Sequence, residues 1–239
     1  MFTENQLSEI KKLISPEKKV VIITHYNPDG DAIGSALGLK HFLNNMGVEP
    51  TVLAPNDFPK FLKWMPDAKK VVIAEYKRKT AGEAIYKADV IFCLDFNAHN
   101  RIGILGDWLM KSWAKKILID HHQQPENFDY VYSDVTIPAT CQMVYHFIEA
   151  LGREDLVDQN VAECLYTGIM TDTGGFRFRS TSATTHRIVA NLIEKGANPA
   201  MITSNTWDTN SVSRLHLLSL ILGRIELVKE GKVAILYLK

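Results

Sequence analysis

Short runs of apolar, β-branched residues alternate with amphipathic segments through the first half of the chain. The apolar runs predict strands at 19–24, 50–54, 70–73, 89–94 and 116–119. The amphipathic segments have apolar residues three and four apart, which predicts helices at 3–14, 31–46, 58–64, 81–87 and 105–113. This alternation is typical of an α/β fold with a doubly wound, mainly parallel sheet flanked by helices.

The second half of the chain is mostly helical in pattern. Helices are predicted at 139–151, 160–170, 184–195, 199–207 and 211–228, and one strand at 231–239. A lone apolar strand needs neighbours to bury its faces. We therefore expect an α/β domain over 1–208, and a linker helix with the first strand of a second α/β domain over 209–239.

Polar residues follow three of the predicted strands directly. His25 comes after the first strand, Asp95 after the strand at 89–94, and Asp120, His121 and His122 after the strand at 116–119. The carboxyl ends of parallel strands meet at one edge of the sheet, where α/β proteins bind their ligands. These side chains are expected to gather at that edge.

The loop after the first strand carries Asp29 and Asp31, separated by Gly30. Two carboxylates this close repel each other unless a cation offsets their charge. Pro28 predicts an extended conformation for Asn27, and Gly30 allows backbone geometry that a Cβ would block. We interpret the loop as half of a metal site.

Asp172 directly follows the helix predicted at 160–170, within the segment TDTGG. A polar residue at this position is often only a cap, but the other acids make it a candidate ligand. Carboxylates and imidazoles without thiolates suit Mn²⁺, Mg²⁺ or Fe²⁺ better than a structural zinc.

Composition narrows the class of protein. The 239 residues have a formal net charge of zero, which argues against a protein that holds nucleic acid through a broad basic surface. Three cysteines lie in apolar segments without CxxC spacing, as expected for free thiols in a reducing compartment. The N-terminal segment has no apolar run typical of a signal peptide, and no stretch is long enough to span a bilayer. We expect a cytoplasmic protein with no membrane partner.

Four motifs in order carry a family resemblance: HYNPDGDAIGS, LDFNAHNRIG, IDHHQ and TGIMTDTGGFRF. Together they resemble the DHH phosphoesterase superfamily, whose name is the Asp120–His121–His122 triplet. The pattern is most similar to the bacterial nano-RNase and pAp-phosphatase branch, which is related to the exopolyphosphatases. Family II inorganic pyrophosphatases and RecJ exonucleases are more distant.

The resemblance implies a pair of divalent metals, usually Mn²⁺, with Mg²⁺ or another divalent ion as the alternative. By motif position, His25, Asp29 and Asp95 would hold one ion, and Asp31, His121 and Asp172 the other. Asp95 would bridge both ions and His122 would face the phosphate, so these two residues would be catalytic. Asp120 would support the loop. The family's C-terminal domain also carries a glycine-rich motif that grips the substrate, and no such motif occurs in these 239 residues.

The expected reaction is hydrolysis of the phosphate ester of a small nucleotide, such as pAp, or of a very short RNA. Two metals can share a water, lower its pKa to give a hydroxide, and stabilise an in-line displacement at phosphorus. An inorganic pyrophosphatase or exopolyphosphatase is the alternative enzyme, and a non-catalytic nucleotide-binding module is the alternative outside the enzymes. The expected partner is a small nucleotide or short oligonucleotide, and a homodimer is a further expectation.

The remaining polar and aromatic residues are interpreted as structural. Arg177 and Arg179 are expected to be solvated on a short strand, although they could bind phosphate. The other histidines and the tryptophans are expected to serve packing or local hydrogen bonds; they are His41, His99, His146, His186, His216, Trp64, Trp108, Trp113 and Trp207.

Overall fold

A parallel sheet of six strands forms the centre of the protein. The computed structural model describes residues 1–237, and the strand order is β3-β2-β1-β4-β5-β6. The strands are β1 (Val20–Ile23), β2 (Thr51–Ala54), β3 (Val72–Ile73), β4 (Val90–Leu94), β5 (Lys115–Asp120) and β6 (Tyr130–Ser133). Every residue of β1 and β4 is buried, because apolar β-branched side chains cover both faces of a central parallel strand. The predicted doubly wound α/β fold is confirmed.

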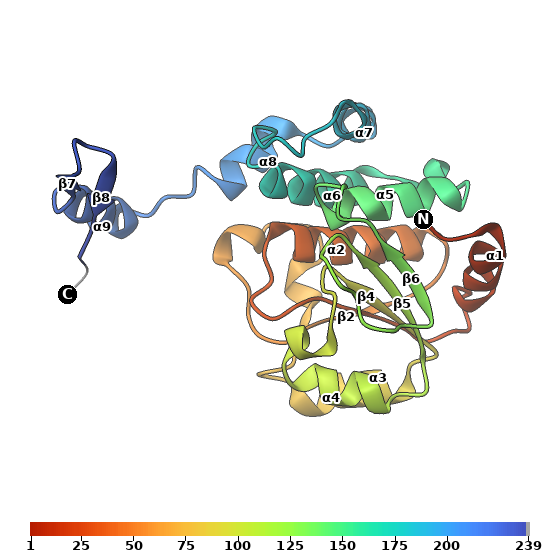
Figure 1. The fold of residues 1–239 in the computed structure, drawn as a ribbon. Helices are drawn as coiled ribbons and strands as arrows, with labels where there is room; N and C mark the ends of the chain where they lie inside the picture. The colour runs from red at the N-terminus through yellow and green to blue at the C-terminus, as the bar shows by residue number, and fades with distance from the viewer. Residues whose placement is uncertain (238–239) are drawn as a thin grey trace.

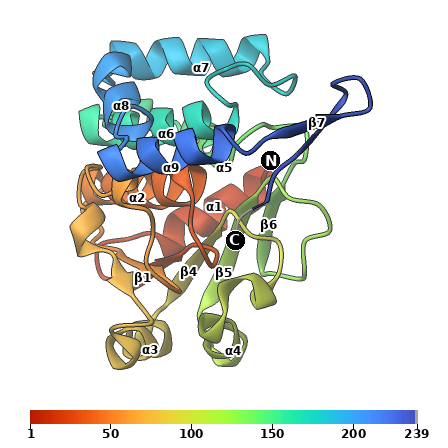
Figure 2. The same cartoon turned by 90° about the vertical axis from the view of Figure 1, so that its left-hand side faces the viewer.

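Helices cover both faces of the sheet (Figures 1 and 2). The apolar cluster on one face includes residues of α1 (Glu4–Leu13), α2 (Gly30–Asn45), α5 (Thr140–Ala150) and α6 (Gln159–Asp172). The cluster on the other face includes residues of α3 (Arg78–Lys87) and α4 (Ile104–Lys111). Figure 1 shows α7 (Ala183–Glu194) and α8 (Pro199–Thr206) as a further layer beyond α5 and α6. No helix of the described residues is long and apolar enough to cross a bilayer.

Three element predictions are wrong in detail. The helix predicted at 58–64 is only a 3₁₀ turn, Lys60–Leu62, and the edge strand β6 is missing from the prediction. The helix predicted at 211–228 ends early: α9 (Val212–Leu222) is followed by the antiparallel pair β7 (Glu226–Val228) and β8 (Val233–Ile235). Positive φ angles at Lys229, Glu230 and Gly231 reverse the chain between these two strands. Residues 238–239 of the predicted last strand lie outside the described residues.

The segment from α9 to β8 stands apart from the sheet and its helices in Figure 1. None of the residues of α9 is buried, although the helix is rich in leucine. Its exposed leucines include Leu217, 54% exposed, and Leu220, 61% exposed. Within the described part of the chain, this segment therefore has no core of its own.

Glycines bring α2 and α6 unusually close together. A Cβ added at Gly34 would lie 2.6 Å from the carbonyl oxygen of Cys164, and one added at Gly168 would lie 2.8 Å from Asp31 Oδ1. At Gly30, a Cβ would lie 2.7 Å from Thr171 Cγ2. Gly30 is thus needed for close packing against α6, and not for the backbone geometry expected from the sequence. This close approach brings the start of α2 next to the end of α6.

Candidate metal centre

The strand order places the predicted site residues at one edge of the sheet. From β1 the chain continues to β2 and β3 on one side of the sheet, and from β4 it continues to β5 and β6 on the other side. The loops that follow the neighbouring strands β1 and β4 therefore lead in opposite directions. His25 follows β1, Asp95 follows β4, and Asp120 is the last residue of β5. The ends of three strands therefore meet at the point where α/β sheets bind ligands.

Asp29 and Asp31 are fixed by helix ends. Asp29 is the N-cap of α2, and its Oδ1 accepts hydrogen bonds of 3.0 Å from the backbone N–H groups of Asp31 and Ala32. Asp31 is 1% exposed and accepts backbone hydrogen bonds from Thr140, at 2.5 Å, and Cys141, at 2.9 Å. The N-cap residue of α5 is an alanine, so Asp31 of α2 satisfies the first N–H groups of α5 instead.

The loop between β1 and α2 differs from the expectation at one residue. Asn27 has a φ of 55° and is not extended. Its backbone N–H donates a hydrogen bond of 2.7 Å to Asn56 Oδ1, and Asn56 Nδ2 donates one of 2.7 Å to Asn27 Oδ1. These two bonds, together with the tolerance of asparagine for left-handed backbone, outweigh the preference that Pro28 imposes.

Asp95 lies at the centre of the cluster in a strained backbone conformation. Its φ is 65°, a left-handed value that non-glycine residues adopt mostly at functional sites and tight turns. The side chain is buried, and Thr140 Oγ1 donates a hydrogen bond of 2.9 Å to Asp95 Oδ1. No pattern in the sequence singles out Thr140, but the structure shows that it holds both Asp31 and Asp95.

His25 and His121 present the same ring nitrogen to the acids. In each histidine Nδ1 lies close to a backbone carbonyl, that of Tyr26 at 2.8 Å and that of Ile137 at 3.2 Å. A hydrogen bond from Nδ1–H to that carbonyl leaves Nε2 facing the acids, as in metal-binding histidines. His25 Nε2 lies 3.5 Å from Asp95 Oδ2 and 3.9 Å from Asp29 Oδ1. His121 Nε2 lies 3.4 Å from Asp95 Oδ1 and 3.5 Å from an oxygen of Asp172, the last residue of α6.

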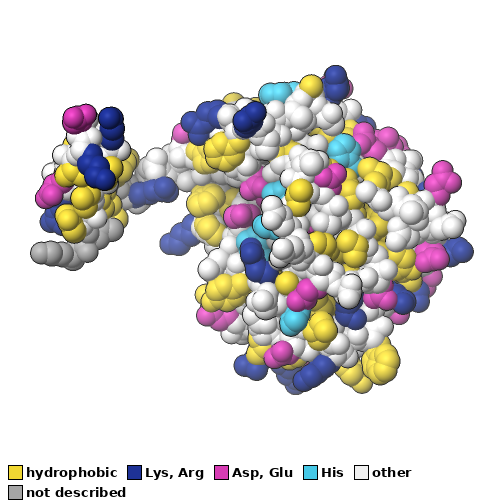
Figure 3. Space-filling view, viewed as in Figure 1, with side chains coloured by type: hydrophobic (Ala, Val, Ile, Leu, Met, Phe, Trp, Pro, Cys, Tyr) yellow, Lys and Arg dark blue, Asp and Glu magenta, His cyan; other side chains and the backbone are white. Residues whose placement is uncertain are grey.

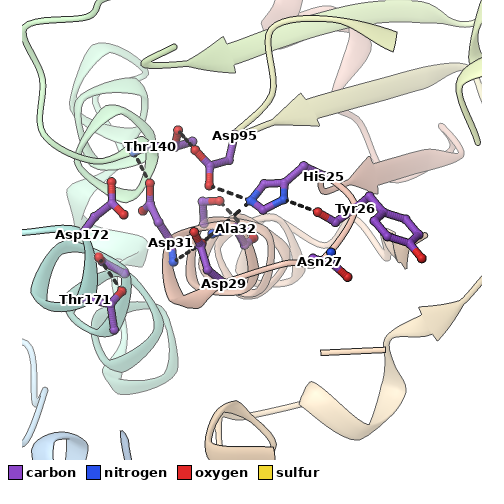
Figure 4. A network of polar contacts seen from close by, with 12 residues as sticks. His25, Tyr26, Asn27, Asp29, Asp31, Ala32, Asp95, Thr140, Thr171 and Asp172 are labelled. Carbon is purple, nitrogen blue, oxygen red and sulfur yellow. Dashed lines mark hydrogen bonds and ion pairs between the residues drawn. The ribbon is translucent and has the colours of Figure 1, made fainter. Parts of the chain in front are cut away.

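These separations suit metal ligands. They are long for hydrogen bonds, whereas two ligand atoms roughly 2 Å from one ion lie about 3–4 Å apart. Ligand atoms lie within 4.8 Å of one another in three groups: His25–Asp29–Asp95, Asp31–His121–Asp172 and Asp95–His121–His122. Figure 4 shows Asp31, Asp95, Asp172 and His25 converging from different elements. The residues of this centre therefore fit divalent cations.

The electrostatics of the cluster also favour a cation. Burial and the neighbouring carboxylates raise the pKa of Asp31 well above its usual value, and raise that of Asp172 to about 6. Burial alone would lower the histidine pKa values, but the surrounding carboxylates raise those of His25 and His121 to about 10. Burial alone would raise the pKa of Asp95, yet the two protonated histidines hold it well below its usual range. Without metal, the cluster retains protons that offset its negative charge.

Asp120 and His122 form a separate pair beside these ligands. Asp120 is fully buried, and its Oδ1 lies 2.7 Å from Nδ1 of His122. Its other oxygen is buried and has no hydrogen-bond partner in the part of the chain that the structure describes. The His122 side chain is 35% exposed, so one edge of its ring remains open beside the cluster.

The structure leaves the other histidines outside the cluster. His99 pairs with Glu126 at 2.6 Å, His41 lies 3.2 Å from the carbonyl oxygen of Pro66, and His146 pairs with Glu149 at 2.9 Å. These contacts agree with their structural interpretation. Arg177 and Arg179 lie in turns after α6 and not on a strand, because three consecutive residues there have positive φ.

Comparison with known proteins agrees with this arrangement. The profile described as "DHH family, N-terminal domain" matches residues 19–169, which include the six strands of the central sheet and all of the predicted ligands except Asp172. The chain belongs to the DHH family.

Two relatives are similar over most of the chain. Over 199 residues it is 34% identical to the bifunctional oligoribonuclease and PAP phosphatase NrnA of Thermus thermophilus, covering 82% of this chain and 56% of that protein. The crystal structure of an exopolyphosphatase-related protein from Bacteroides fragilis superposes with a TM-score of 0.95 at 38% identity, covering 99% of this chain and 70% of that one. The chain thus spans little more than half the length of the Thermus relative.

A third solved structure shares the fold only. The putative family II inorganic pyrophosphatase of Methanococcus jannaschii gives a TM-score of 0.53 at 19% identity, covering 78% of this chain and 60% of that one.

Proposed function

We propose that this protein is a metal-dependent phosphoesterase that hydrolyses phosphate esters of small nucleotides, such as pAp or very short RNA. The observation that carries the proposal is a pair of neighbouring ligand groups that meet at the buried Asp95. One group is His25, Asp29 and Asp95, and the other is Asp31, His121 and Asp172, in which His121 Nε2 lies 3.4 Å from Asp95 Oδ1. The similarity to the Thermus oligoribonuclease and PAP phosphatase supports the substrate class.

His25, Asp29 and Asp95 would hold one divalent cation, and Asp31, His121 and Asp172 the other, with Asp95 shared between them. Oxygen and imidazole ligands without thiolate favour Mn²⁺, with Mg²⁺ as the alternative. When bound, such a pair of cations lowers the pKa of water and offsets the charge of a phosphate group.

His122 would contact the phosphoryl oxygens. Asp120 would accept a hydrogen bond from the Nδ1–H of His122, which leaves Nε2 at the open edge of the ring to donate a hydrogen bond or a proton. Because Asp120 is fully buried, it keeps the imidazole in one orientation. Asp120 is therefore a positioning residue, and His122 the residue that touches the substrate.

We further propose that residues 209–239 begin a second domain and that the protein acts in the cytoplasm, with a homodimer as the expected assembly. The exposed leucines of α9 support the first point, since a helix of this composition needs a partner surface. All three cysteines are free and buried, which is consistent with a reducing compartment.

Asp95→Asn tests the function and the shared ligand together. Asparagine tolerates the left-handed backbone at this position, so the variant should fold. We expect it to bind fewer than two Mn²⁺ ions per chain by calorimetry and to lose Mn²⁺-dependent hydrolysis of pAp and dinucleotides. Asp107→Asn, a change at an exposed acid of α4, is the matched control.

Substrate comparison separates the alternatives. Faster hydrolysis of pyrophosphate or polyphosphate than of pAp would favour the inorganic phosphatases. Metal-dependent nucleotide binding without turnover would favour a binding module. Full activity of Asp95→Asn would refute the site assignment.

A further inference from the structure

The chain leaves Asp172 through a rigid turn. Gly174, Gly175 and Phe176 have consecutive positive φ angles of 57°, 72° and 66°. Thr173 Oγ1 donates a hydrogen bond of 2.6 Å to the carbonyl of Ile169 and accepts one of 3.0 Å from the backbone N–H of Phe176. The Phe176 ring packs edge-on against Tyr166, with centroids 5.8 Å apart. The surface next to the metal centre is thus fixed in shape.

Two aromatic rings lie against this turn with much of their surface open, Phe178 from the turn itself and Trp207 from the end of α8. Phe178 is 56% exposed and Trp207 is 40% exposed, so both rings offer apolar surface to a ligand. A Cβ at Gly174 would lie 2.6 Å from the Phe178 ring, and one at Gly175 would lie 2.7 Å from the Trp207 ring. Each ring therefore covers a glycine and exposes its remaining surface to solvent.

Positive charge accompanies the rings. Arg177 Nε donates a hydrogen bond of 2.6 Å to the carbonyl of Gly174, so the guanidinium is held at the same turn, and its terminal N–H groups form no hydrogen bond within residues 1–237. Arg177 and Arg179 form no ion pair with a carboxylate of the described residues. On the face shown in Figure 3, hydrophobic and basic side chains lie close to the acidic and histidine side chains.

Open aromatic faces combined with arginines are the features with which proteins hold single-stranded nucleic acid. Inorganic pyrophosphate and polyphosphate have no aromatic group that could stack on these rings. A nucleobase would stack on them, and its neighbouring phosphate would pair with an arginine.

We propose that Phe178, Trp207 and Arg177 form a subsite for one nucleobase and an adjoining phosphate of a single-stranded substrate. This inference rests on the proposed function and extends it: the substrate has at least one base outside the metal centre, and the site holds it without sequence preference. The aromatic residues thus serve binding, where the sequence suggested packing for Trp207.

The subsite is tested by a binding cycle between protein and ligand. A non-hydrolysable 5′-phosphorylated dinucleotide is titrated into the Mn²⁺-loaded chain, alongside two analogues that each lack one base. Base stacking on an aromatic residue contributes about 1–3 kcal/mol, or about 5- to 150-fold in affinity. We expect the analogue that lacks one particular base to bind more weakly than the parent dinucleotide by this factor. In Phe178→Ala, that analogue and the parent dinucleotide should bind with the same affinity. Phe178→Tyr should restore the difference.

Trp113→Ala is the matched control, since Trp113 is 99% exposed and follows α4 on the other face of the sheet. It should keep the full dependence on the base. Equal Mn²⁺-dependent binding of all three ligands would overturn the subsite and leave the proposed function standing, as would undiminished discrimination in Phe178→Ala. A chain that binds none of the ligands in the presence of Mn²⁺ would overturn both.

Discussion

Gly34→Ala should destabilise the fold and weaken metal binding at the candidate metal centre, because Gly34 lies where α2 packs against α6. The new Cβ would lie 2.6 Å from the Cys164 carbonyl oxygen, about 0.8 Å short of an ordinary contact of 3.4 Å. The blocking atom belongs to the backbone of α6, so no rotamer change can relieve the clash and the helices must separate.

The change in the free energy of unfolding follows from two opposing effects. Alanine improves the helix propensity by about 1 kcal/mol. Overpacking by one methyl group costs about 1–3 kcal/mol, and the backbone obstacle places Gly34 at the upper end of this range. We expect the free energy of unfolding to fall by about 1–2 kcal/mol. Because α2 carries Asp31 and α6 carries Asp172, we expect Mn²⁺ affinity to fall by about 10-fold or more.

Urea unfolding followed by circular dichroism and Mn²⁺ titration by calorimetry measure the two effects. Gly82→Ala is the matched control, since its Cβ would come no closer than 3.7 Å to Trp108 and it lies within α3, away from the site. That variant should be as stable as the unchanged chain or up to about 1 kcal/mol more stable. If Gly34→Ala behaves like Gly82→Ala in both assays, the close approach of α2 and α6 does not position the ligands.

Thr140→Val keeps the side-chain shape but removes the hydrogen bond to Asp95, so the affinity for Mn²⁺ should fall about 10-fold. Thr140→Ser keeps the hydroxyl and should restore the affinity. Equal affinity in the unchanged chain and both variants would exclude a positioning role for Thr140. Since the pKa values of His25 and His121 are raised to about 10, both rings carry a proton at pH 7 without metal. Binding of Mn²⁺ must then release these protons, so the affinity for Mn²⁺ should rise from pH 6 to pH 8. Calorimetry in two buffers of different protonation enthalpy counts the protons released. A count of zero would contradict the prediction. Partial burial would raise the pKa of Asp67, but two lysines hold it at about 2, below the ordinary 3.8. Asp67 therefore adds about 2 kcal/mol to the free energy of unfolding above pH 3.8, and this contribution is lost as the pH falls toward 2. Asp67→Asn should be less stable than the unchanged chain at pH 6 and equally stable near pH 2, and a constant difference in urea unfolding would refute this.

The inner strands of the central sheet could be predicted because they are buried on both faces. Runs such as those of β1 and β4 have no polar residue to make them ambiguous, and the rule that parallel strands share one active edge then groups His25, Asp95 and the Asp120 triplet. The edge strand β6 was missed because its residues, YVYS, are only partly buried and mix apolar with polar side chains.

Contacts between distant segments could not be predicted from local patterns. The bonds from Thr140 and Cys141 to Asp31 join residues more than 100 positions apart, and nothing in either segment signals the other. The end of α9 was misplaced because the predicted helix was carried past Gly223, which is its C-cap. Beyond this glycine, Ile225 and Leu227 alternate with charged residues, a pattern of period two that is typical of a strand.

The capping of α5 by Asp31 means that one carboxylate belongs to the protein's fold and to its candidate ion site at once. The amide protons of Thr140 and Cys141 are therefore natural reporters of the site. Their rate of exchange with deuterated solvent depends on how firmly Asp31 is held, so ion occupancy can be followed at the first turn of a buried helix without substrate, turnover or an added label.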